Sequence, residues 1–264
     1  MSGTDTDTPS ALTVRLHDEA AAVLTVGDEE LTPALVDRVR AAAEKAEGAD
    51  RGVVLLLLGG AGAAEGASPA GTGIHLVNTW ERALRRLETS GRPTLALVEG
   101  TCTGPALETL LTADYRIAAG DARLRLSGAE DGAWPSTAVH RLAQQIGTAR
   151  ARRLLLRRPW LDGEQAADLD LVDETADGGE AALRRAVLVA GELSAVPGRE
   201  WSIRRRLLFD ATLSYEEALG AHLAACDRSL RHRTTAGQTA ADQAAAEQTS
   251  AEQAAADGSL ARAR

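Results

Sequence analysis

Apolar and polar positions near the start of the chain predict two strands and a helix. Residues 12–27 (LTVRLHDEAAAVLTVG) alternate in polarity and contain many β-branched residues, which indicates two short strands joined by a polar turn. Residues 28–48 (DEELTPALVDRVRAAAEKAEG) place Thr32 and Pro33 just before an apolar stripe that begins at Leu35. Thr at the N-cap and Pro at the first helical position are typical of a helix start, so a helix is expected here.

Two uninterrupted apolar runs predict strands that are buried on both faces. They are residues 51–60 (RGVVLLLLGG) and residues 92–100 (RPTLALVEG). Helices are expected after each, at 78–90 (NTWERALRRLETS) and at 104–114 (GPALETLLTAD), the second entered through a Gly-rich turn. The Gly- and Ala-rich segment 60–73 follows the first run, at the end of a strand where open α/β folds usually place ligands.

The second half of the chain is mainly helical in pattern. Residues 115–126 predict two more short strands, after which residues 135–156 carry arginines on one side and leucines at helical spacing. Further helices are expected at 180–196 and at 214–232, the latter opening with Ser and Glu in capping-box spacing. The predicted divisions are a disordered tail (1–10), a core (11–175), a C-terminal helical region (176–232) and a low-complexity tail (233–264).

Composition excludes several classes of function. The 264-residue chain has a net charge of −9, which repels phosphate backbones and anionic lipids, so neither nucleic acid nor a membrane is expected as a partner. Its two cysteines, Cys102 and Cys226, form no CxxC pair and have no His at metal spacing, which argues against a disulfide framework or a metal site. No apolar run approaches the roughly 20 residues of a membrane span, and a cytoplasmic protein is expected.

A set of motifs, taken in order, resembles the crotonase superfamily of enoyl-CoA hydratases and isomerases. The family's buried strand is matched by RPTLALVEG, and its glycine turn and glutamate-bearing helix are matched at Gly104 and Glu108. Its D-x-x-I-A segment is matched by TADYRIAAGDARLRL. The family's proline turn is matched at Pro135, and its R-L-x-x-x-x-G helix is matched by HRLAQQIGTARARRLLL. Its A-x-x-x-G-L-V motif, which ends the core, is matched by GEQAADLDLVDE. The resemblance covers about residues 12–232. It implies an α/β fold with a crotonase-type spiral core of ββα units, followed by a C-terminal helical oligomerisation region.

Within that superfamily the chain looks most similar to the DpgB-type proteins of 3,5-dihydroxyphenylglycine biosynthesis. The segments that carry this similarity are WERALRR, GPALETLLTADYRIA, AWP and EEALGAHLAACDR. Those proteins are accessory partners of a type III polyketide synthase. The resemblance therefore implies an acyl-CoA thioester as substrate, no cofactor beyond the coenzyme A of that substrate, and a homotrimer or dimer of trimers.

Two functions from different classes follow from this resemblance. The protein is either a lyase-like enzyme that assists dehydration and aromatisation of a polyketide CoA thioester to 3,5-dihydroxyphenylacetyl-CoA, or a non-catalytic, degenerate crotonase. In the second case it binds and stabilises the synthase or its intermediate. A third class, a stand-alone fatty-acid hydratase, predicts turnover of crotonyl-CoA, which we do not expect.

Crotonase-type chemistry needs two backbone N–H groups aimed at the thioester oxygen. The family places one donor at the middle residue of a Gly-Gly-Gly turn, and that residue is here Pro105, which has no N–H. Either Ala106 at the helix start takes over the role, or a one-residue shift in register makes Gly104 the donor. Alternatively, Pro105 only starts the helix and no oxyanion is bound. For the other donor, in segment 60–73, the candidates are Ala63 and Ala64.

Glu108 matches the first catalytic glutamate of the family, which handles water or the α-proton. The alternative to this catalytic role is a structural one, in which the negative charge of Glu108 stabilises the start of the helix. The second glutamate of hydratases falls at Gly128, which has no side chain, although Glu130 and Asp131 are close. With one carboxylate where hydration uses two, we expect chemistry that needs a single base.

Other residues with chemical potential have competing interpretations. Cys102 borders the turn, but without an assigned base a small buried side chain is expected. Trp134 either lines an acyl pocket or packs in the core. The arginines of 150–158 and 204–206 either contact CoA phosphates or form a solvated helix face or a subunit contact.

Overall fold

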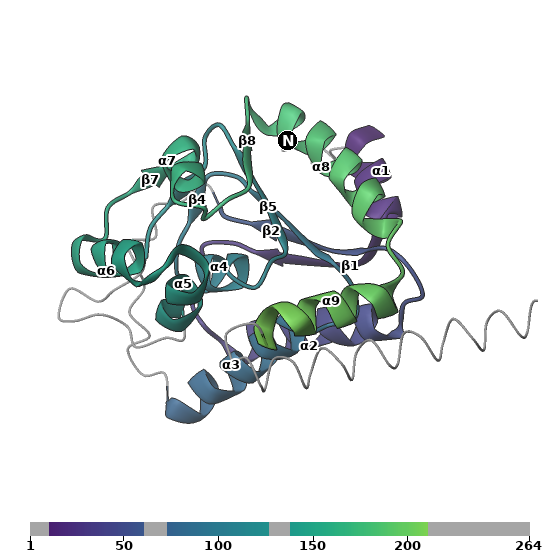
Figure 1. Ribbon diagram of the computed structural model, residues 1–264, viewed down its shortest axis with the longest axis horizontal. Helices are drawn as coiled ribbons and strands as arrows, with labels where there is room; N and C mark the ends of the chain where they lie inside the picture. The colour runs from purple at the N-terminus through teal and green to yellow at the C-terminus, as the bar shows by residue number, and fades with distance from the viewer. Residues whose placement is uncertain (1–10, 61–72, 127–137, 211–264) are drawn as a thin grey trace, which may run out of the picture. The chain divides into compact units, whose positions relative to one another are not determined.

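The computed structural model describes residues 11–60, 73–126 and 138–210 (Figure 1). The chain divides into two compact units, Met1–Ser202 and Ile203–Arg264. In the second unit only the end of helix α9 (Gly198–Asp210) is described. Both predicted tails and the helix predicted at 214–232 lie outside the described residues, and the predicted division at residue 175 stays a prediction.

A five-stranded parallel sheet forms the centre of the first unit. Its order is β1-β2-β3-β5-β8, and all four neighbouring pairs are parallel. The strands are β1 (Ala20–Val26), β2 (Val53–Leu58), β3 (Thr94–Val98), β5 (Tyr115–Ala119) and β8 (Glu174–Ala176). Every residue of β3 is buried, and so is every residue of β2 except Leu57. The prediction of two doubly buried strands is therefore confirmed.

Helices cover both faces of this sheet (Figure 1). On one face α1 (Ala11–Asp18) and α8 (Gly179–Ser194) pack against β2, β3 and β5 in a small apolar core. A larger core on the other face is built by α2 (Pro33–Gly48), α3 (Ile74–Glu88), α4 (Gly104–Leu110), α5 (Ala138–Ile146), α6 (Thr148–Arg157) and α7 (Gly163–Asp168). Helix α4, which carries Glu108, therefore lies on the side with the larger core.

A small second sheet extends this arrangement. It contains β4 (Thr101–Cys102), β6 (Arg123–Leu124) and β7 (Leu161–Asp162) in the order β4-β6-β7. Strands β4 and β6 are parallel, whereas β6 and β7 are antiparallel. Because β4 directly precedes α4, this second sheet fixes the start of the helix that carries Glu108.

Two predictions at the level of single elements are wrong. Residues 11–18 form helix α1 instead of a strand, and Leu16 is fully buried in the small core that α1 shares with α8. The helical segment expected at 135–156 is interrupted at Gly147, whose φ of 79° ends α5 and precedes α6. Glycine adopts positive φ without steric cost, so the chain turns there.

Local capping explains where two helices begin. The N–H of Leu35 donates to Thr32 Oγ1 at 3.2 Å, which confirms Thr32 as the predicted N-cap of α2. Helix α7 begins with a reciprocal capping box between Asp162 and Gln165. The D-x-x-Q spacing of that box was visible in the sequence but was not used to predict a helix.

Glu174 makes the stability of the sheet edge depend on pH. Tyr115 Oη donates to Glu174 Oε1 at 2.6 Å, and Arg185 Nε donates to both carboxylate oxygens at 2.9 and 2.7 Å. Burial raises the pKa of Glu174, but the hydrogen bonds from Arg185 and Tyr115 outweigh burial and hold that pKa below its usual value. A depressed pKa contributes stability that is present above the unfolded-state pKa of about 4.3 and is lost as pH falls through the folded-state value.

We therefore expect Glu174→Gln to destabilise the protein most at pH 7. The difference in free energy of unfolding between wild type and variant should shrink as the pH falls through the lowered pKa of Glu174, because the wild-type carboxyl then becomes neutral as well. Urea denaturation at pH 7, 5 and 3 measures this difference. An equal difference at all three pH values would contradict the prediction.

Candidate active site

Glu108 is a buried carboxylate on a short helix. It lies in α4, with 7% of its surface exposed, between the buried residues Leu107 and Thr109. Helix α4 belongs to the larger core, to which Ala106, Leu107 and Leu110 contribute. A carboxylate in such surroundings needs polar partners, because burying an unpaired charge is costly.

The turn before Glu108 shows how Pro105 is accommodated. Thr103 is the N-cap in an extended conformation, Gly104 follows with a φ of 49°, and Pro105 occupies the first turn of the helix. Proline fits there because the first N–H groups of a helix have no intrahelical partner. The N–H of Ala106 donates to Thr103 O at 3.1 Å. Pro105 thus starts the helix, while the oxyanion roles of Gly104 and Ala106 stay predictions.

The two segments expected to supply oxyanion donors are joined where they begin. Gly60 and Thr101 form an antiparallel bridge with two hydrogen bonds, from Gly60 N–H to Thr101 O (3.1 Å) and from Thr101 N–H to Gly60 O (2.9 Å). Gly60 immediately precedes the segment that contains Ala64, and Thr101 lies shortly before Gly104. Ala64 and the rest of residues 61–72 lie outside the described residues, so the role of Ala64 stays a prediction.

A direct contact between α3 and α4 defines the surroundings of Glu108. Trp80 Nε1 donates a hydrogen bond of 2.5 Å to Glu108 Oε2, and 1% of the surface of Trp80 is exposed. Trp80 lies on the buried face of α3, together with Leu84 and Leu87. Its contact with Glu108 was not predicted, because the two residues are 28 positions apart and no local pattern links them.

Helix α3 is also held by a buried ion-pair network. Arg141 of α5 donates to Glu88 Oε1 (3.3 Å) and to Glu81 Oε2 (3.2 Å), and Arg85 pairs with Glu88 (2.9 Å). The side chains of Arg141 and Glu88 are each 8% exposed. Since Glu81 directly follows Trp80, this network fixes the helix that presents the indole to Glu108.

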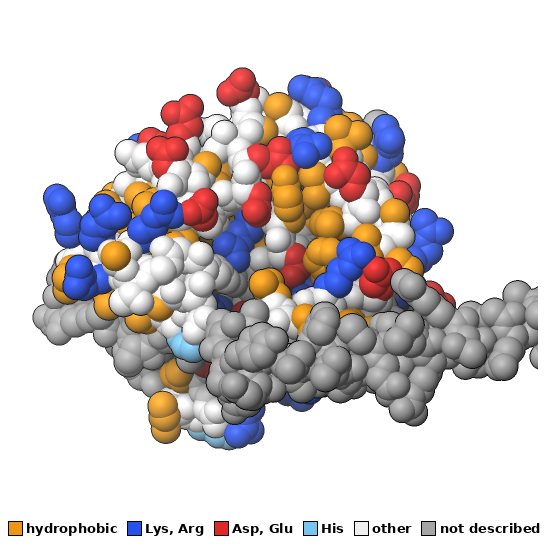
Figure 2. All heavy atoms as spheres, in the orientation of Figure 1, with side chains coloured by type: hydrophobic (Ala, Val, Ile, Leu, Met, Phe, Trp, Pro, Cys, Tyr) orange, Lys and Arg blue, Asp and Glu red, His pale blue; other side chains and the backbone are white. Residues whose placement is uncertain are grey.

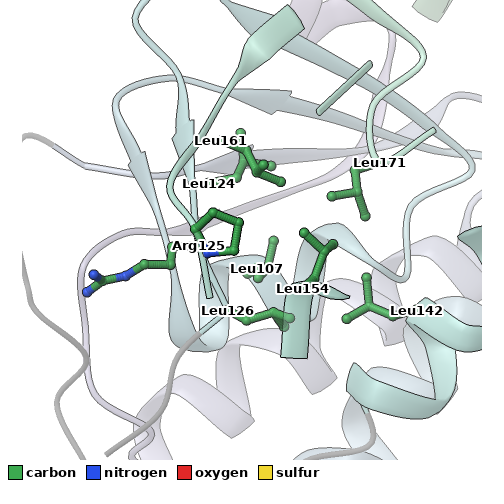
Figure 3. Close-up of a pocket in the computed structure, with 9 residues that line it drawn as sticks. Leu107, Leu124, Arg125, Leu126, Leu142, Leu154, Leu161 and Leu171 are labelled. Atoms are coloured by element: carbon green, nitrogen blue, oxygen red, sulfur yellow. The ribbon is translucent and has the colours of Figure 1, made fainter. Parts of the chain in front are cut away.

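An apolar pocket lies beside α4 (Figure 3). The space between its lining atoms amounts to about 280 Å³, a volume that includes open solvent. Figure 3 shows leucines from several elements around it, with Leu107 of α4 among them. Its lining consists of Leu107, Leu124, Arg125, Leu126, Leu142, Leu154, Pro159, Leu161 and Leu171. The pocket thus provides apolar space next to the helix that carries Glu108.

Several other predicted positions are described only in part. Gly128, Glu130, Asp131 and Trp134 lie outside the described residues, and their roles stay predictions. Cys102 is completely buried, and burial, reinforced by the charge of Asp28, raises the pKa of its thiol far above the ordinary value. A thiol that stays protonated is a poor nucleophile, in agreement with the small buried side chain that the sequence predicts.

Arginines gather on the surface of α6 (Figure 2). Arg152, Arg153 and Arg157 are exposed, and Arg150 pairs with Asp170. Within residues 11–60, 73–126 and 138–210, no helix is both long and apolar enough to cross a membrane. Over the same described residues, no group of three or more His, Cys, Asp or Glu side chains is arranged to hold a metal ion.

Comparison with known proteins gives a consistent result. The family model for enoyl-CoA hydratase/isomerase matches residues 75–204. An enoyl-CoA-hydratase of Amycolatopsis orientalis is 40% identical over 211 residues, which cover 80% of this chain and 95% of that protein.

Solved structures agree with this fold. A crystal structure of an enoyl-CoA hydratase from Shewanella pealeana matches with a TM-score of 0.66 at 17% identity, covering 85% of this chain and 92% of the other. An enoyl-CoA hydratase from Thermoplasma volcanium matches with a TM-score of 0.65 at 21% identity, covering 79% and 89% respectively. The fold is therefore of the crotonase type, and the chain belongs to the enoyl-CoA hydratase/isomerase family.

Proposed function

We propose that this protein acts on a CoA thioester beside a type III polyketide synthase. In this role it assists dehydration and aromatisation of a poly-β-keto intermediate to 3,5-dihydroxyphenylacetyl-CoA. The observation that carries the proposal is the buried Glu108, held by Trp80 in the second turn of α4 in a chain of this family. The two segments that this contact joins, WERALRR and GPALETLLTADYRIA, are among those that resemble the DpgB-type proteins.

The proposed reaction needs one proton-transfer group. The carboxylate of Glu108 takes a proton from a carbon next to the thioester carbonyl, and the electron pair moves onto the carbonyl oxygen. Backbone N–H groups of the Gly104 turn and of the segment containing Ala64 stabilise that oxygen. Once ring closure onto the β-carbonyl has left a β-hydroxyl group, the electron pair returns to form a C=C bond, the β C–O bond breaks, and Glu108 returns its proton to the leaving hydroxide, giving water. A single carboxylate is sufficient because the proton it takes is the proton it gives back.

Reconstitution with purified synthase tests this proposal. Reactions contain the synthase with wild-type protein, with Glu108→Gln, or alone, and the product distribution is followed by chromatography. We expect wild-type protein to increase 3,5-dihydroxyphenylacetyl-CoA and Glu108→Gln to give the level of the synthase alone. Stimulation by Glu108→Gln equal to that by wild type would show that Glu108 is not the proton-transfer group. Crotonyl-CoA, followed by absorbance, should not be turned over.

A non-catalytic role is the second candidate, and the geometry of the turn favours it. Pro105 offers no N–H, and the N–H of Ala106 already donates to Thr103 O. In that case the protein binds the synthase or its intermediate without transferring protons. It then stimulates product formation equally with Glu108 or Gln at position 108, so the same reconstitution distinguishes the two functions.

A further inference from the structure

We infer that Trp80 is a positioning residue that holds the Glu108 carboxylate in its reactive orientation through the indole N–H. The inference rests on the proposed function, because it assigns a purpose to the contact only if Glu108 transfers protons. It starts from one contact, the 2.5 Å hydrogen bond from Trp80 Nε1 to Glu108 Oε2, between two buried side chains.

The chemistry of the indole suits this purpose. An indole N–H donates but neither accepts a hydrogen bond nor titrates, so it holds a carboxylate without competing for the proton that the carboxylate carries. A hydrogen bond to an ionised group is shorter and stronger than one between neutral groups. Glu108 has several rotatable bonds, and this contact restricts them on the side facing α3.

The donor itself is fixed by its surroundings. Trp80 packs in the larger core together with Leu84 and Leu87 of the same helix. The next residue, Glu81, pairs with Arg141 of α5. Neither the ring nor its helix can shift without breaking buried contacts, so Trp80 places the carboxylate reproducibly.

This role predicts a specific kinetic effect for Trp80→Phe. Phenylalanine keeps an aromatic ring in the core but has no N–H, so the carboxylate loses this hydrogen bond and is held less firmly. The kcat of the Glu108-dependent reaction on the CoA thioester should fall by about tenfold, because misplacement of a reacting group is costly. Its KM should change less than twofold, because Trp80 is not proposed to contact the CoA thioester.

Two further variants separate positioning from packing. Leu87→Val removes a methylene from the same buried face of α3 without touching Glu108, and its kcat should stay at the wild-type value. Glu108→Gln leaves Trp80 in place and removes the charge. In ¹⁵N-labelled protein, the indole proton signal of Trp80 should lie far downfield and exchange slowly with solvent, and it should move upfield in Glu108→Gln while the other indole signals stay in place.

The outcomes are distinguishable. A lower kcat for Trp80→Phe with unchanged KM, together with the shifted indole signal, supports the inference. If Glu108→Gln abolishes stimulation but Trp80→Phe has wild-type kcat, or if no indole signal responds to Glu108→Gln, positioning by Trp80 is overturned and the proposed function stands. If Glu108→Gln stimulates fully, the proposed function fails and the positioning role fails with it, even if the indole signal reports the bond. Should Trp80→Phe not fold, the indole signal in wild type and Glu108→Gln still decides whether the bond exists.

Discussion

Arg141→Ala should lower the free energy of unfolding by about 4 kcal/mol, because it leaves buried carboxylates without their cation. Glu88 is as buried as Arg141, with 8% of its side chain exposed, and Glu81 is 16% exposed. Arg85 remains as a partner of Glu88, but its side chain is 55% exposed and its charge is therefore partly screened by water. The loss should also loosen the attachment of α5 to α3.

The matched control is Arg184→Ala on the surface. Arg184 pairs with Glu180 within α8, and their side chains are 56% and 76% exposed. An exposed pair of this kind contributes at most about 0.5 kcal/mol, so this variant should unfold almost like wild type. Urea denaturation of both variants at pH 7 measures the contrast. Equal losses would mean that the Arg141 network contributes no more than a surface pair.

Gly59→Ala is expected to cost about 4 kcal/mol through backbone strain and overpacking together. Gly59 has a φ of 102°, and a Cβ atom added there would lie 2.2 Å from Glu99 O. That oxygen belongs to the backbone that follows β3 and cannot rotate away as a side chain would. Relief of the clash requires the ends of β2 and β3 to separate.

Gly191→Ala provides the control for this substitution. Gly191 lies inside α8, and an added Cβ would meet no atom within 4 Å. Alanine is a better helix former than glycine, so this variant should be more stable by about 0.5 to 1 kcal/mol. In thermal or urea unfolding, the change in free energy of unfolding relative to wild type should therefore have opposite signs for the two variants. A stable Gly59→Ala protein would contradict the close backbone contact at this position.

The elements predicted correctly are those with long, unambiguous patterns. The Val and Leu run of β2 and the capped, amphipathic sequence of α2 each specify one structure locally. The strand prediction for residues 11–18 was wrong because Leu12, Val14 and Leu16 alternate with polar residues as in a strand. Eight residues also contain too few helical turns to reveal a period of 3.6. Contact with α8, which is distant in sequence, determines the conformation of this segment.

The site was predictable as far as it depends on local motifs. The Gly104–Pro105 turn and the helix carrying Glu108 follow from a short stretch of sequence, and the structure places them as expected. The partner of Glu108 was not predictable, because Trp80 has the same apolar periodicity as its neighbours on α3. A hydrogen bond between distant segments forms only when helices pack against each other, so the local pattern around Trp80 could not reveal its contact with Glu108.

The bridge between Gly60 and Thr101 has a consequence for changing the specificity of this protein. Because this pair of hydrogen bonds fixes Gly60 against Thr101, the spacing between the starting points of the two predicted donor segments is a property of the scaffold. Libraries that randomise positions 61–72 can therefore explore new acyl groups while the spacing of the two anchor points is inherited unchanged.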